Sequence, residues 1–94
     1  MNDIVQKWEP KTLDEAHFAT NVSIALKDIA GRYLLPNEVR NFIGRAIVRD
    51  ETSVRLRFHT EIIEHFSLNP ITDQEKIKKA LDLISEMEED RRKK

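Results

Sequence analysis

Residues 50–68 read DETSVRLRFHTEIIEHFSL, and the secondary structure of this stretch decides the fold class. Its first part, Val54–Phe58, alternates apolar and basic side chains, which is strand periodicity. The longer pattern is helical, because apolar residues recur four positions apart, at Val54, Phe58, Ile62 and Phe66. We predict a helix, since Ile62, Ile63 and Phe66 can be buried together only on a helix, and a lone strand has no partner elsewhere in the chain.

Upstream, residues 13–30 have the pattern of an amphipathic helix. Thr12 and Glu15 have the T-x-x-E spacing of a capping box, in which each side chain binds a free backbone N–H at a helix start. Apolar residues follow at helical spacing, and Gly31 is a typical stop signal. We therefore predict a helix over 13–30.

A second upstream helix is predicted to open at Pro36 or Asn37 and to end near Arg49. Apolar side chains recur along it with helical period. Gly44 lies in its interior, where glycine lowers helix stability, so it indicates that another backbone crosses there or that a ligand groove passes it.

Downstream, Asn69-Pro70 ends the helix of the decisive stretch, and Thr72 with Glu75 forms a second T-x-x-E pattern. Apolar residues at helical spacing then predict a helix over 73–89. Residues 90–94 are predicted to be a frayed, charged tail.

The composition fits these four helices. The chain has 94 residues, of which 39% are hydrophobic and 35% charged, with two glycines, three prolines and no cysteine. We expect a single all-α domain over 1–94, a bundle of about four short helices with an extended arm at residues 1–11 that carries Trp8. No signal peptide or long apolar run is visible, so we expect an intracellular protein, cytoplasmic by default, with no membrane contact.

Charge is unevenly distributed along the chain. Residues 31–60 contain six arginines against three acids, whereas acids exceed bases in both flanking segments. Arginine pairs with carboxylate or phosphate through two hydrogen bonds, so the cluster is a candidate recognition surface. We predict a partner-binding site that consists of Arg45, Arg49, Arg55, Arg57 and Trp8. The alternative is that these arginines pair with the protein's own acidic flanks or coat a solvated helix face.

Enzymatic chemistry has no recognisable basis in this sequence. It lacks a glycine-rich phosphate loop and a nucleophile in a known setting, so we expect no enzyme and no cofactor. Glu61 and His65 lie four apart and could share a metal ion with outside ligands, but an ordinary ion pair is the favoured interpretation, and no metal site is predicted. We expect a protein-interaction module, such as an accessory subunit, adaptor or small regulator, whose partner has an acidic surface; the low net charge of -1 argues against nucleic acid.

Two resemblances give alternatives, both confined to the second half of the chain. The run Ile43–Arg49, followed by Phe66, Asn69, Asp73, Lys76 and Ile77, resembles the pattern of mitochondrial LYR-motif assembly factors. That resemblance implies a small helical adaptor whose basic surface meets an acyl carrier protein and its acylated prosthetic group. Gly44 stands where that family has its signature tyrosine.

If residues 53–58 formed a strand, with helices over 60–68 and 73–89, the chain would be similar to ribbon-helix-helix repressors. This resemblance implies a dimer whose paired strands enter the major groove of DNA, with Arg55 and Arg57, or their neighbours, meeting the DNA.

Overall fold

The decisive stretch is helical in the computed structural model, which describes residues 8–92. Helix α3 runs over Val54–Phe66. Its start is capped by Ser53, whose hydroxyl oxygen accepts a hydrogen bond from the backbone N–H of Leu56 at 3.1 Å. The predicted helix is confirmed, and residues 53–58 do not form the strand that the ribbon-helix-helix resemblance requires.

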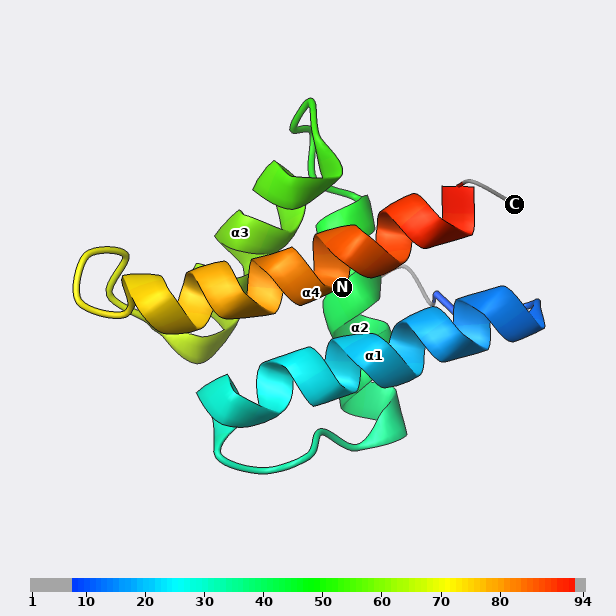
Figure 1. Cartoon of the computed structure of the whole chain (residues 1–94), viewed down its shortest axis with the longest axis horizontal. Coiled ribbons are helices and arrows are strands. Elements are labelled where there is room, and N and C mark those ends of the chain that lie inside the picture. Colours follow the sequence, from blue (N-terminus) through cyan, green and yellow to red (C-terminus); the bar gives the residue numbers. More distant parts are fainter. Residues whose placement is uncertain (1–7, 93–94) are drawn as a thin grey trace, which may run out of the picture.

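Three more helices complete the fold, so the predicted all-α bundle is confirmed for the described part of the chain. They are α1 (Leu13–Ala30), α2 (Pro36–Ile47) and α4 (Gln74–Arg92). α1 and α4 lie side by side and run in opposite directions, while α2 crosses behind them and α3 returns beside α2 (Figure 1). Each helix thus packs on two others, which lets four apolar stripes close one core.

Local signals fix the limits of α1, and the predicted bounds are confirmed. The hydroxyl oxygen of Thr12 accepts a hydrogen bond from the Glu15 N–H at 3.1 Å, and the Glu15 carboxylate accepts one from the Lys11 N–H at 2.7 Å. At the other end Gly31 adopts φ 79°, a left-handed conformation that favours glycine, and its N–H bonds the carbonyl of Lys27 at 2.8 Å.

The expected start of α4 is wrong in its detail. No Thr72–Glu75 capping box forms. Instead the side-chain oxygen of Asn69 accepts hydrogen bonds from the N–H groups of Ile71 and Thr72. The carboxylate of Asp73 accepts one from the N–H of Asn69 at 3.0 Å. Asparagine can mimic a backbone turn in this way, so the connection closes on itself and the helix begins at Gln74.

The other ends of the elements differ from expectation by a few residues. α2 ends at Ile47, so Arg49 lies in the connection to α3. α4 continues through Arg92, three residues past its predicted end at residue 89, and residues 93–94 of the expected tail lie outside the described part of the chain. Of the predicted arm, residues 1–7 lie outside the described part of the chain, while residues 8–11 are non-helical.

The core centres on Phe42 of α2, which is fully buried. Its ring lies 5.7 Å from that of Phe58 and 6.3 Å from that of Phe66, both on α3. The other helices add buried aliphatic side chains, among them Val22, Leu26, Leu81 and Ile84. Among the described residues, no helix is long and apolar enough to span a membrane.

Candidate binding sites

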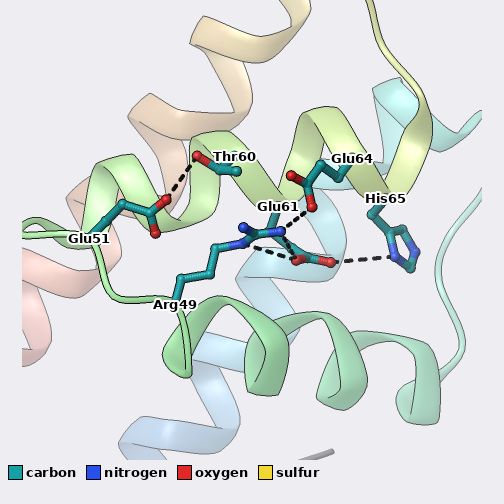
Figure 2. Close-up of polar contacts among 6 residues, drawn as sticks. All are labelled: Arg49, Glu51, Thr60, Glu61, Glu64 and His65. Atoms are coloured by element: carbon teal, nitrogen blue, oxygen red, sulfur yellow. Dashed lines mark hydrogen bonds and ion pairs between the residues drawn. The ribbon is translucent and has the colours of Figure 1, made fainter.

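The structure does not gather the four predicted arginines into one surface. Arg49 turns toward α3, where its Nη2 lies 3.1 Å and its Nε 3.3 Å from Oε1 of Glu61 (Figure 2). Its Nη2 also donates to the carboxylate of Glu64. Burial lowers the pKa of Arg49, but the hydrogen bonds that it donates to Glu64 and Glu61 outweigh that effect and raise it, so the side chain stays charged.

Glu61 is the buried member of this charge cluster, with an exposed fraction of 3%. Its second oxygen lies 3.7 Å from Nδ1 of His65, one helical turn later (Figure 2). A buried carboxylate needs such partners, since an unpaired one is costly. Arg49 therefore links the α2–α3 connection to α3 through the hydrogen bonds that it donates to Glu61 and Glu64.

Glu61 and His65 do not form part of a metal-binding group in the described structure. Within residues 8–92 no cluster of three or more His, Asp or Glu side chains is placed to hold a metal ion. The 3.7 Å between Nδ1 of His65 and a carboxylate oxygen of Glu61 agrees with the ion pair that the sequence predicts for these two residues.

Arg55 is engaged in a second internal contact, between α3 and α4. Its guanidinium donates to Asp82 at 2.9 Å and to the hydroxyl of Ser85 at 3.1 Å. Hydrogen bonds from Lys78 and from Arg55 lower the pKa of Asp82. Both Arg55 and Asp82 are about half exposed, so this contact is a surface ion pair of small energetic weight.

Arg45 and Arg57 have different surroundings. Arg45, on α2, is exposed and has no ion pair with any described residue. Arg57 is partly buried, and its Nε is shielded from solvent without a hydrogen-bond partner in the described part of the chain. Of the five predicted residues, only Arg57 and Trp8 come together, because both line the same pocket.

That pocket, the Arg57 pocket, has a volume of about 260 Å³ and takes residues from all four helices. Trp8 packs against the core beside it. The rest of the lining is mostly apolar, with two carboxylates, and comprises Glu15, Phe18, Ile43, Ala46, Ile47, Val54, Phe58 and Glu88. Because Glu15, Arg57 and Glu88 all line it, about half of the surface that the pocket exposes is polar.

A second hollow, the α1–α2 groove, has a volume of about 430 Å³. It lies between the outer face of α1 and the start of α2, and its lining includes Pro10, Thr20, Ile24, Tyr33, Val39 and Arg40. Sequence reasoning missed this groove. Two features of the sequence indicate it. The connection between Gly31 and Pro36 is largely apolar, and Ile24 lies on α1 outside its buried apolar face.

Comparisons with protein-family models, with curated proteins and with solved structures found no match for this chain.

Proposed function

We propose that this domain is a protein-interaction module that receives a short apolar and acidic segment of a partner protein in the α1–α2 groove. The observation that carries the proposal is the exposure of large apolar side chains at the groove. Ile24 is 51% exposed and Tyr33 60% exposed. Contiguous apolar surface of this kind is typical of a site that a partner covers.

The apolar surface extends along α1 beyond the groove itself. Leu13, Thr20 and Ile24 are spaced by seven and four residues, which places them on one helix face. Leu13 is among the most exposed apolar side chains of the described structure, and so is Leu35, which precedes α2. A partner segment that followed α1 would therefore cover Leu13 as well as Ile24.

The charge at the groove selects an acidic partner. Arg40 is the one charged side chain among the described lining residues. The Lys27 ammonium group lies 4.7 Å from the centroid of the Tyr33 ring and adds a second positive charge beside the groove. A carboxylate on the partner segment would meet both charges without opposition from an acidic lining residue.

This proposal keeps the expected acidic partner but moves its binding place. Arg49 and Arg55 are held in intramolecular ion pairs, so recruiting them to a partner would first break those contacts. The groove requires no such exchange.

The experiment is selection of peptides from a random display library, followed by affinity measurement on a synthesised winner by fluorescence anisotropy. We expect enriched peptides to combine apolar side chains with Asp or Glu. Ile24→Glu should weaken the selected peptide at least about ten-fold, because it places a charge in the contact centre. Arg40→Glu should weaken it too and reduce its salt dependence.

The matched control is Ile71→Glu. Ile71 is 74% exposed, but it lies in the α3–α4 connection, away from the groove lining. It should leave the affinity nearly unchanged. Failure to enrich any peptide, or equal binding by the Ile24→Glu variant, would overturn the proposal. Retention of duplex DNA with a steep salt dependence would instead move the function to nucleic acid.

A further inference from the structure

The α1–α2 groove lies on a side of α1 along which no other described helix runs. α4 runs alongside α1, whereas α2 crosses behind it (Figure 1). The ion pair between Asp28 and Lys79 of α4, at 3.2 Å, marks the side of α1 that faces α4. At 3.6 residues per turn, the groove residues Ala19 and Ser23 lie about 180° and about 140° around α1 from Asp28. The groove side of α1 therefore has room for a second helix alongside it.

The wall that α1 contributes to the groove consists mostly of short side chains. Ala19, Thr20 and Ser23 line it together with one large residue, Ile24. Short side chains let a second helix come within the spacing of about 8–10 Å that is usual between the axes of packed helices. Ile24 and Tyr33, both more than half exposed, then supply the apolar contact. The shape of the groove thus suits the apolar face of a helix.

The backbone around the groove also favours a helical segment over an extended one. Buried peptide groups need hydrogen-bond partners, which a helix supplies to itself and which an extended segment takes from a strand edge. The described residues 8–92 contain no strand. Pro10 and Pro36 in the lining have no N–H to donate, and the N–H of Leu35 already donates to the Glu38 carboxylate at 2.8 Å. An extended segment would find few main-chain partners here.

The charges along α1 set the direction of such a helix. α1 has Asp14 and Glu15 in its first turn and Lys27 in its last turn. Acidic residues stabilise a helix when they lie in its own first turn, at the positive end of its dipole. They meet Lys27 only if the partner helix begins beside the end of α1. In the opposite direction they would approach Asp14 and Glu15, and like charges repel.

We propose that the segment received by the α1–α2 groove is an amphipathic α-helix that lies antiparallel to α1 and carries Asp or Glu in its first turn; this inference rests on the proposed function of the groove. The exposed apolar residues Leu13 and Ile24 are eleven positions apart, or about 16 Å along α1. A helix of about three turns covers both. Its apolar side chains recur at helical spacing on the face that meets α1.

Proline substitution in the partner segment tests the helical state. The probe is the peptide selected by display on the full chain, made in two variants with proline either in the middle or at the first helical position. Proline in a helix interior should weaken binding at least about 100-fold by fluorescence anisotropy. Proline at the first position is the matched control and should change the affinity less than about three-fold, because a helix start tolerates it. Backbone chemical shifts of the labelled peptide in the complex should be helical.

A nitroxide label at either end of the same peptide tests the direction. A label at its N-terminus should broaden the amide resonance of Lys27, and a label at its C-terminus that of Leu13. Full affinity of the middle-proline variant, extended chemical shifts or the reverse broadening pattern would overturn this inference while leaving the groove as a peptide site. If the selection enriches no peptide, or if Ile24→Glu binds the winner as tightly as the wild type does, the proposed function fails and this inference falls with it.

Discussion

Substituting Arg49 should destabilise the domain more than substituting its buried partner, Glu61. Glu61 is 3% exposed and Arg49 is 22% exposed, so the carboxylate is the more deeply buried charge. Arg49→Met leaves that carboxylate with only His65, at 3.7 Å. Breaking a buried pair in this way costs about 3–5 kcal/mol, and the partial exposure of Arg49 places this case near the lower limit, about 3 kcal/mol.

Substituting Glu61 instead should cost less stability. Glu61→Leu removes the buried charge itself, and Arg49 keeps Glu64 and its contact with water. We expect a loss of about 1 kcal/mol, typical of one partly compensated hydrogen bond. The double variant buries no charge, so it should cost about as much as Glu61→Leu alone, which makes it about 2 kcal/mol more stable than Arg49→Met.

The assay is urea unfolding of the four proteins at neutral pH, followed by circular dichroism. Urea unfolding should give a free energy of unfolding about 3 kcal/mol lower for Arg49→Met than for the wild type. Thermal melts of the same proteins should show a Tm lower by about 12–24 °C, since 1 kcal/mol corresponds to about 4–8 °C in a domain of this size. The half-exposed pair of Arg55 and Asp82 is the control, with a coupling below about 1 kcal/mol. Additive losses at Arg49 and Glu61, or a double variant less stable than Arg49→Met, would refute this account of the cluster.

Three further substitutions have defined outcomes. The hydrogen bond from Arg32, with a second from the Leu35 N–H, lowers the pKa of Glu38 from 4.5 to about 2. The stabilisation that the Glu38 carboxylate gives is therefore complete above pH 4.5 and is lost as the pH falls toward 2. Glu38→Gln should accordingly lower Tm at pH 7 and converge with the wild type near pH 2, as thermal melts across that range would show. Phe42→Ala, which empties the fully buried centre of the core, should cost about 3–5 kcal/mol in urea unfolding. Gly31→Ala should cost about 1 kcal/mol through backbone strain alone, because φ is 79° and nothing lies within 4 Å of the added methyl group; a neutral result would contradict that assignment.

The sequence predicts best those helices whose ends are marked by capping or terminating residues at the ends themselves. Thr12 and Gly31 stand directly at the ends of an apolar stripe, and α1 begins and ends where they indicate. α3 has a strand-like start, so its helical state follows only from apolar residues further along, at Ile62 and Phe66. The Ser53 cap was not predicted, because a serine before alternating residues is an equally ordinary start for a strand.

The candidate sites are harder to predict, because they depend on side chains distant in sequence. Arg49 binds a residue 12 positions later, and Arg55 binds one 27 positions later, so no local pattern shows that either is already paired. A count of arginines gives the charge of a segment but not its partners. The alternative that arginines pair with the acidic flanks agrees with both contacts, whereas the groove emerges only when α1 and the start of α2 are placed together.

The groove and the Arg57 pocket share α1 and α2 but no described lining residue. On α2 the groove is lined as far as Arg40 and the pocket from Ile43, so the two hollows lie at successive turns of one helix. Helices packed in a core move as rigid units rather than bending between turns, because close packing resists small displacements. Occupying one hollow could therefore alter the other only by shifting α2 as a whole, a motion that would disturb Phe42 at the centre of the core. A peptide bound in the groove should consequently leave the shape of the Arg57 pocket unchanged.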